Sequence, residues 1–267
     1  MEHLHGWLNP DFWLHVASGA LVGFFVGLTG VGGGSLMTPI LILLFGFAPV
    51  TAVGTDQLFA SITKTFGSLV HGYNRTIDWR LVGRLALGSV PAAIFTLTGL
   101  YYLRVSGGPA NALVTKVLSV ALIFTATSLI FRPWIVALYN RRVGKLTPSA
   151  TFRLTILTGL ILGILVSLTS VGAGALGVTA LILLYPEMPI SRIIGSDVAH
   201  AVPLTLVAGL GHWLQGTVNL SLLASLLLGS IPAIALGSWL VPKLPERSLR
   251  LILAAILLVV SSRFLLQ

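Results

Sequence analysis

Long apolar stretches constrain the fold of this chain more than any other feature of its sequence. A membrane-spanning helix needs about 20 apolar residues at a rise of about 1.5 Å each. The chain has 16 basic and 7 acidic residues among 267, whereas soluble domains carry about a quarter of such residues. The sequence therefore predicts an all-α polytopic membrane protein. The stretches that reach or approach the length of a span are residues 53–70, 81–103, 112–131, 193–214, 220–241 and 249–266.

Composition also excludes several classes of protein. The formal net charge of +9 is typical of nucleic-acid binders, but its placement suits the anionic cytoplasmic leaflet better, so we expect no nucleic-acid partner. The chain has no cysteine, which excludes a disulfide framework, a thiolate metal site and a cysteine nucleophile. Residues 1–11 contain no Lys or Arg, which argues against a cleaved signal peptide.

Two further apolar stretches, 12–47 and 152–185, are too long for one span and too short for two. Each is interrupted near its middle, by Gly-Val-Gly-Gly-Gly-Ser at 30–35 and by Ser-Val-Gly-Ala-Gly-Ala at 170–175. Glycine weakens a helix locally, so we expect each stretch to be a hairpin of two short helices joined by an unwound turn. The backbone of such a turn must be buried in protein or line a cavity, because lipid cannot satisfy it.

An internal repeat relates the two halves of the chain. Residues 28–49 match 168–189 at 11 of 22 positions, and residues 54–92 match 195–233 at 13 of 39. A leucine-rich composition does not explain matched Asp, His and Pro residues. These matches include Asp56/Asp197, His71/His212, Pro49/Pro189 and Pro91/Pro232.

The repeat predicts two halves, residues 1–131 and 152–267, joined by a basic cytoplasmic linker at 132–151. Each half would hold one glycine-broken hairpin and three transmembrane helices. The first half would contain the hairpin 12–47 and spans of about 53–73, 81–103 and 112–131. The second half would contain the hairpin 152–185 and spans of about 193–215, 220–241 and 249–266.

The distribution of basic residues predicts how the halves are oriented. If each hairpin enters and leaves on one face, every half crosses the membrane three times and the second half is inverted. With the linker inside, 12 basic residues then lie inside and 3 outside, whereas parallel halves give 9 and 6. Because basic residues concentrate in cytoplasmic loops, inverted repeats with both termini outside are favoured.

Inverted repeats with broken helices are typical of secondary transporters, which bind substrate near the midplane. A half-helix that begins inside the membrane presents free N–H groups and a positive dipole end to an anion. Alternatively, the glycines only permit close helix packing. The candidate substrate-binding residues are Gly32, Gly33, Gly34, Ser35, Thr55, Gln57, Lys64, Gly172, Gly174 and Ser196.

Several of these runs resemble the TauE/SafE family of sulfite exporters, also called toluene-sulfonate-uptake-permease-like transporters. They are Gly-Val-Gly-Gly-Gly-Ser-Leu at 30–36 with Pro39, Ala-Val-Gly-Thr at 52–55 and Asn-Arg-Thr-Ile-Asp-Trp-Arg at 74–80. The resemblance covers essentially the whole chain. It implies a multi-pass protein of a bacterial or archaeal plasma membrane that moves sulfite, thiosulfate or organosulfonates, often as an exporter. The chain departs from the family at Asp56, where members commonly have Ser after Gly-Thr, and again has Asp at 197.

The two aspartates are candidates for proton coupling, because ionisable groups within spans are costly and often functional. A protonated carboxyl can donate a hydrogen bond to an anion and carry a proton. Alternatively, Thr55 and Ser196 cap helices, and Asp56 and Asp197 lie in the first turn at the positive dipole end. Lys64 has no charged counterpart in the repeat; it either attracts the anion or is a structural partner of an aspartate.

Three histidines complete the candidate set for proton coupling. His71 and His212 match across the repeat and lie near the ends of spans, where they can relay protons or bind backbone. His200 lies one turn from Asp197 and can form a hydrogen-bonded pair with it.

An enzyme, a membrane scaffold and a cation-coupled transporter are the alternative functions. The chain has no His-Glu-x-x-His helix, no Gly-x-Ser-x-Gly elbow and no phosphate-binding loop, so we expect no enzyme, catalytic residue, cofactor or metal. A non-transporting scaffold would not need polar residues matched between halves. A cation- or proton-coupled transporter of another small solute stays open, because the aspartates can bind Na⁺ or H⁺. The coupling ion and the oligomeric state also stay open.

Overall fold

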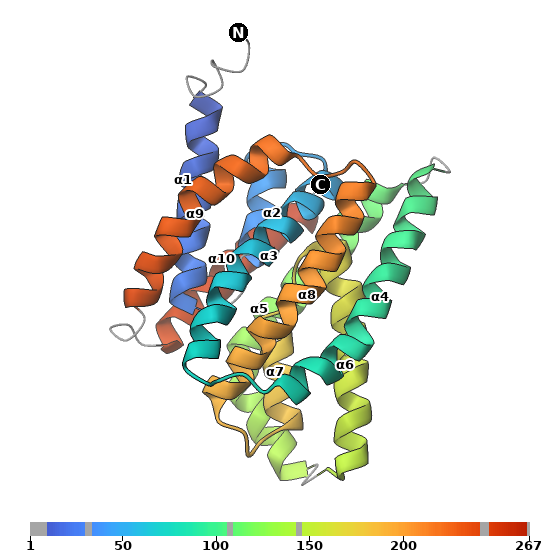
Figure 1. The fold of residues 1–267 in the computed structure, drawn as a ribbon, viewed down its shortest axis with the longest axis vertical. Helices are drawn as coiled ribbons and strands as arrows, with labels where there is room; N and C mark the ends of the chain where they lie inside the picture. Colours follow the sequence, from blue (N-terminus) through green and yellow to red (C-terminus); the bar gives the residue numbers. More distant parts are fainter. Residues whose placement is uncertain (1–9, 30–33, 106–108, 143–145, 241–245, 266–267) are drawn as a thin grey trace.

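The computed structural model describes residues 10–29, 34–105, 109–142, 146–240 and 246–265. Throughout these residues the regular secondary structure is α-helical (Figure 1). The fold is therefore all-α, as the apolar stretches predict. The helices are α1 Pro10–Thr29, α2 Gly34–Leu43, α3 Pro49–Tyr73, α4 Trp79–Val105, α5 Ala110–Arg142, α6 Pro148–Thr169, α7 Leu176–Leu184, α8 Ile190–Leu214, α9 Leu220–Leu240 and α10 Glu246–Leu265.

Four of these helices are long and apolar enough to cross a membrane by length and composition. They contain the spans Trp79–Arg104, Ala110–Tyr139, Pro148–Thr169 and Ile190–Leu214. Helices α9 and α10 contribute shorter apolar segments. Large apolar side chains such as Phe95, Phe124 and Leu228 are exposed on the outer surface, where lipid can cover them. Helix α3 is more polar than these spans, and most of its polar side chains are buried within the protein.

The second glycine-rich run interrupts a helix. Helix α6 ends at Thr169 and α7 begins at Leu176. Between them Ser170, Gly172 and Gly174 have φ angles of 59°, 126° and 103°, which no right-handed helix accommodates. In the first half, α1 ends at Thr29 and α2 begins at Gly34; residues 30–33 lie outside the described part of the chain.

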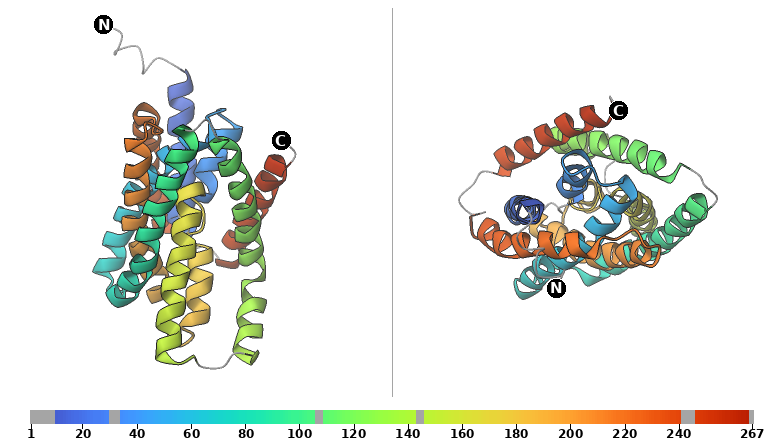
Figure 2. Two further views of the ribbon diagram at one scale, coloured as in Figure 1. Left: turned by 90° about the vertical axis from the view of Figure 1, so that its right-hand side faces the viewer. Right: turned by 90° about the horizontal axis from the view of Figure 1, so that it is seen from above.

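The two short helices return to opposite ends of the molecule (Figure 1). Helix α1 begins at the upper end, and the connection from α2 to α3 lies at that end too. Helix α5 ends and α6 begins at the lower end, as Figure 2 also shows, and the connection from α7 to α8 lies at that end too. Helices α3 and α8 pack against each other in the interior, α1 packs on α9, α6 packs on α4, and α5 packs on α10.

Glycines bring the backbones of two of these helix pairs into contact. A side chain at Gly19 of α1 would collide with the backbone of Leu226 in α9. A side chain at Gly159 of α6 would collide in the same way with the backbone of Leu85 in α4. Small residues permit such close approach between membrane helices, where dispersion contacts take the place of the hydrophobic effect.

Helix α5 extends further than the apolar pattern predicts. It continues through Pro133 to Arg142, into the segment 132–151 that the sequence analysis assigns to a linker. Arg132 therefore lies within a helix and is buried, rather than in a loop.

Candidate functional site

Two fully buried carboxyl groups lie on the central pair of helices. Asp56 belongs to α3 and Asp197 to α8, and both side chains have 0% exposure. Helix α3 begins at Pro49 and α8 at Ile190, with Ala48 and Pro189 in the N-cap positions. Both aspartates therefore lie beyond the first helical turn, so the alternative in which Thr55 or Ser196 caps its own helix is wrong.

The carboxyl group of Asp197 lies against the start of α7. A side chain at Gly177 would collide with Oδ1 of Asp197, so glycine is needed for this approach. The backbone of Gly174, in the break before α7, also lies close to the carboxyl group. Neither oxygen of Asp197 has a hydrogen-bond partner in the described part of the chain. A helix start is a favourable place for a negative charge, because its N–H groups and dipole are positive.

Asp56 lies between α2 and the break in the second half. Thr38 of α2 donates a hydrogen bond from Oγ1 to Oδ2 of Asp56 over 2.5 Å. The hydroxyl group of Ser170 lies near the same carboxyl group. Oδ1 of Asp56 and Oγ of Ser170 have no hydrogen-bond partner among the described residues. Each aspartate is therefore next to a short helix of a broken pair.

Lys64 interacts electrostatically with both carboxyl groups. Its side chain is only 6% exposed, two turns along α3 from Asp56. Its charge acts on both Asp197 and Asp56, although neither carboxyl group accepts a hydrogen bond from it. The structure thus brings three of the predicted residues within electrostatic range of one another in the interior.

The three histidines divide between the centre and its periphery. His200 is fully buried, and its Nε2 is hydrogen-bonded to Oγ of Ser89 over 2.7 Å. It does not pair with Asp197, whose oxygens have no partner in the described part. His71 is bonded to Thr76 over 2.9 Å and His212 to Thr217 over 3.1 Å, so these two residues stabilise turns at the ends of α3 and α8.

The neutral candidates have different surroundings. Gln57 donates a hydrogen bond from Nε2 to the carbonyl oxygen of Val166, and its Oε1 has no described partner. Thr55 and Ser196 are buried and accept hydrogen bonds from backbone amides of loops in the opposite half.

The candidates in the breaks are only partly described. Gly172 and Gly174 lie in the second break and adopt positive φ angles. Gly34 begins α2, and Ser35 is buried in its first turn. Gly32 and Gly33 lie outside the described residues.

Arg132 is a buried cation that sequence reasoning does not place in the site. Its Nε donates a hydrogen bond to Oγ1 of Thr179 in α7 over 3.2 Å, and Ser128 donates to the same atom over 2.9 Å. Its charge acts on Asp197. Pro133 hides this residue in the sequence, because proline within a helix usually marks its end.

Several buried polar atoms of the candidate residues and their neighbours have no hydrogen-bond partner in the described part of the chain. They cost about 1–3 kcal/mol each when buried without a partner, so a group of them indicates a place for water, an ion or a ligand. No group of three metal-ligating side chains occurs in the described part of the chain. The unpaired atoms include Asp56 Oδ1, Gln57 Oε1, Ser167 Oγ, Ser170 Oγ, both oxygens of Asp197 and His200 Nδ1.

The chain is similar to known membrane transporter proteins. The model of the family described as "Sulfite exporter TauE/SafE" matches residues 15–264. The chain is 41% identical over 245 residues to the "Probable membrane transporter protein YjnA" of Bacillus subtilis, covering 91% of this chain and 96% of the relative. It is 27% identical over 271 residues to a "Probable membrane transporter protein" of Methanocaldococcus jannaschii, covering 94% and 95% of the two chains. No solved structure matches the chain significantly.

Proposed function

The chain belongs to the TauE/SafE sulfite exporter family, and from that premise we propose that it carries a small sulfur-containing anion across the membrane by alternating access. As a member of this family it is a multi-pass plasma-membrane transporter and not an enzyme. The proposed substrates are sulfite, thiosulfate and organosulfonates, with export as the direction that the family name suggests. The proposal rests on a buried lysine that interacts electrostatically with two buried carboxyl groups, one of which lies against the start of α7.

Two inverted halves, residues 1–131 and 152–267, would provide the alternating motion. In the repeat, α1 corresponds to α6 and α9 corresponds to α4. The contact between α1 and α9 therefore corresponds to the contact between α6 and α4, and both contacts occur. The close contacts follow the same exchange, since Gly19 with Leu226 corresponds to Gly159 with Leu85. These matched contacts support a pseudo-twofold axis between α3 and α8. With the end of α5 and the start of α6 on the cytoplasmic side, the two broken pairs would enter from opposite faces.

An anion would bind at the start of α7 and near Lys64. The helix start and the ammonium group supply positive charge, and the glycines of the break allow the ligand to approach the backbone. Asp197 now lies at this helix start, so an ionised carboxylate and an anionic substrate would compete for one positive region.

This competition would couple anion binding to protons. When the carboxyl groups of Asp56 and Asp197 are protonated, they no longer repel the anion and can donate hydrogen bonds to it. Anion binding would therefore take up protons, and anion and protons would cross together. The net direction would then follow the sum of the two gradients. His200, bonded to Ser89 beside this centre, is the histidine best placed to exchange protons with it.

Coupling of the anion to Na⁺ is the second candidate, and buried oxygen atoms without a described partner favour it. Asp197, Asp56, Gln57 and Ser170 each have a buried oxygen without a described hydrogen-bond partner, and Ser170 lies near Asp56. Oxygen atoms of this kind are ligands for hard cations. A bound Na⁺ would neutralise the carboxylates in place of protons and would serve the same role toward the anion.

Flux measurements in proteoliposomes test the proposal. Labelled sulfite, thiosulfate, an organosulfonate and a panel of cations would be offered under an imposed proton gradient or an imposed Na⁺ gradient. We expect anion accumulation that a proton gradient drives in the wild-type protein, and that Asp56→Asn with Asp197→Asn abolishes. Accumulation driven only by Na⁺ would support the second candidate, and transport of cations without any anion would overturn the proposal.

A further inference from the structure

Two connecting loops reach across the molecule and bond to the opposite central helix, one residue before each buried carboxyl group. The amide of Asp78, between α3 and α4, donates a hydrogen bond to Oγ of Ser196 over 2.8 Å. The amide of Asn219, between α8 and α9, donates to Oγ1 of Thr55 over 3.0 Å. We call these contacts the Asp78 latch and the Asn219 latch. Sequence reasoning assigns Thr55 and Ser196 to substrate, but here their hydroxyl groups bind these loops.

Each latch residue also begins the next helix. Oδ1 of Asp78 accepts hydrogen bonds from the amides of Arg80 and Leu81 over 3.0 and 3.1 Å. Oδ1 of Asn219 accepts one from the amide of Leu222 over 3.0 Å. A side chain that caps a helix start fixes the chain direction there. Opening a latch would therefore move α4 or α9 together with the loop.

The turn before each latch packs against a glycine of the opposite helix. A side chain at Gly195 would come within 3.0 Å of Thr76 Oγ1, and one at Gly54 within 2.9 Å of the His212 Cβ. These glycines precede Ser196 and Thr55 directly. His71 and His212 thus stabilise the turns that precede the two latches. Because Gly195 and Gly54 have no side chain, these turns pack directly against α8 and α3.

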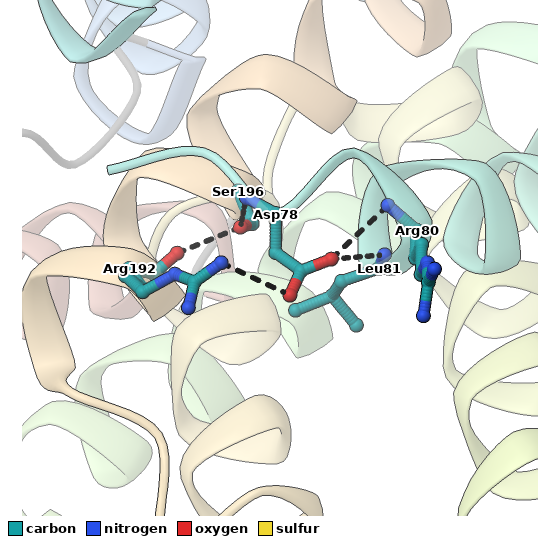
Figure 3. A network of polar contacts seen from close by, with 5 residues as sticks. All are labelled: Asp78, Arg80, Leu81, Arg192 and Ser196. Carbon is teal, nitrogen blue, oxygen red and sulfur yellow. Dashed lines mark hydrogen bonds and ion pairs between the residues drawn. The ribbon is translucent and has the colours of Figure 1, made fainter. Parts of the chain in front are cut away.

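The two latches differ in charge. In the Asp78 latch, Arg192 of α8 forms an ion pair with Oδ2 of Asp78 over 3.4 Å (Figure 3). The Arg192 side chain is 46% exposed and that of Asp78 is 23% exposed. Thr51 takes the place of Arg192 in the repeat, and Asn219 takes the place of Asp78. Salt therefore weakens the first latch and leaves the second nearly unaffected.

We propose that the Asp78 and Asn219 latches are the two gates of the transport cycle. Both are closed here, and both carboxyl groups behind them have no exposed surface. The structure is then the occluded state, and each half-cycle opens one latch while the other stays closed. The lower connection of α3 to α4 and the upper connection of α8 to α9 place the gates at opposite ends (Figure 1). This inference rests on the proposed function.

Paired cysteines test the gates directly, because the chain has no native cysteine. The pairs Asp78→Cys with Ser196→Cys and Thr55→Cys with Asn219→Cys would be cross-linked by a short, reducible bis-methanethiosulfonate reagent. Sulfite exchange would then be measured in proteoliposomes before cross-linking, after it, and after reduction. The four single-cysteine variants treated with the same reagent are the controls.

We expect either cross-link to stop exchange, reduction to restore it, and the single variants to keep most of their untreated rate. If sulfite exchange in a cross-linked sample continues at the rate measured before cross-linking, the proposal that the latches are gates is wrong. Cysteine pairs that do not cross-link would also contradict it. Wild-type protein that moves no anion of the panel would instead refute the proposed function.

A second measurement needs no cysteine variant. We expect hydrogen exchange at the amides of residues 78 and 219 to slow at least several-fold when sulfite or thiosulfate binds the wild-type protein, because a bound anion favours the occluded state. Raising the salt concentration should speed exchange at residue 78 more than at residue 219, and Arg192→Gln should remove this difference. Equal salt effects at both amides in the wild-type protein would contradict the charged gate.

Discussion

At the scale of single residues, the account depends on a few buried charges. Lys64, Asp56 and Asp197 come from two helices that pack together, and the repeat places the two aspartates in equivalent positions. An ionisable group in a membrane interior is costly and normally faces a partner, a cavity or a substrate path. Asp56 Oδ1 and both oxygens of Asp197 have no described hydrogen-bond partner, which supports the proposal that a ligand binds there.

Lys64→Met tests the attraction of the anion. We expect the dissociation constant for thiosulfate to rise about 10- to 100-fold, since a hydrogen bond to a charged group contributes about 1.5–3 kcal/mol. Isothermal titration calorimetry on purified protein measures it. Lys116→Met, at an exposed position of α5, is the matched control and should leave the constant unchanged. An unaltered affinity in Lys64→Met would remove this residue from the site.

Arg132→Gln tests the cation that sequence reasoning misses. Loss of its charge near Asp197 and of its bond to Thr179 should lower the rate of anion exchange about tenfold, because α7 loses a contact that positions it. Arg132→Lys keeps the charge and should recover part of the rate. Arg153→Gln, at an exposed position of α6, should have no effect, and a similar loss there would show that net charge alone is responsible.

Part of this site can be predicted from the sequence, and the rest depends on three-dimensional contacts. Matched Asp residues and helical spacing indicate that Asp56 and Lys64 share a buried face. The roles of Thr55 and Ser196 are not visible in sequence, since their partners are amides about 120–160 residues away. Arg132 is missed because a proline follows it inside a helix that does not end there.

At the scale of helices, close backbone contact holds the outer pairs together. The apolar pattern predicts most of the helices but not the full length of α5, which continues through Pro133 to Arg142. Helix α3 is more polar than the four candidate spans, and most of its polar side chains are buried within the protein.

Gly19→Ala and Gly159→Ala test the matched contacts between helices. Each added methyl group would collide with the backbone of Leu226 or Leu85, so we expect each variant to lose about 1–3 kcal/mol of stability, as overpacked sites do. The loss should be similar in both. Thermal unfolding in detergent measures it. Gly83→Ala, which meets nothing within 4 Å, should be neutral or stabilising by up to about 1 kcal/mol.

At the scale of the whole molecule, the account requires two halves inserted in opposite directions. The helix pairs that exchange with one another, the two broken pairs that return to opposite ends (Figure 1) and the matched latches all agree with this arrangement. In this arrangement most basic residues would lie at one set of loops, and the positive-inside rule predicts that this set is cytoplasmic.

Single cysteines at Ala48 and Pro186 test the opposite insertion. Both positions are exposed, one between α2 and α3 and the other between α7 and α8. A membrane-impermeant thiol reagent should label Ala48→Cys in intact cells, and it should label Pro186→Cys only after permeabilisation. Labelling of both positions from one side would refute inverted halves.

Proton uptake on anion binding decides whether the protein couples the anion to protons. Thiosulfate does not titrate near neutral pH, so any protons bound belong to the protein. Titration calorimetry in buffers of different ionisation enthalpy counts these protons. We predict that thiosulfate binding takes up protons, that affinity rises up to about tenfold per unit fall in pH for each proton linked, and that Asp56→Asn with Asp197→Asn abolishes the uptake. Binding with no proton uptake, or with proton release, would contradict the account.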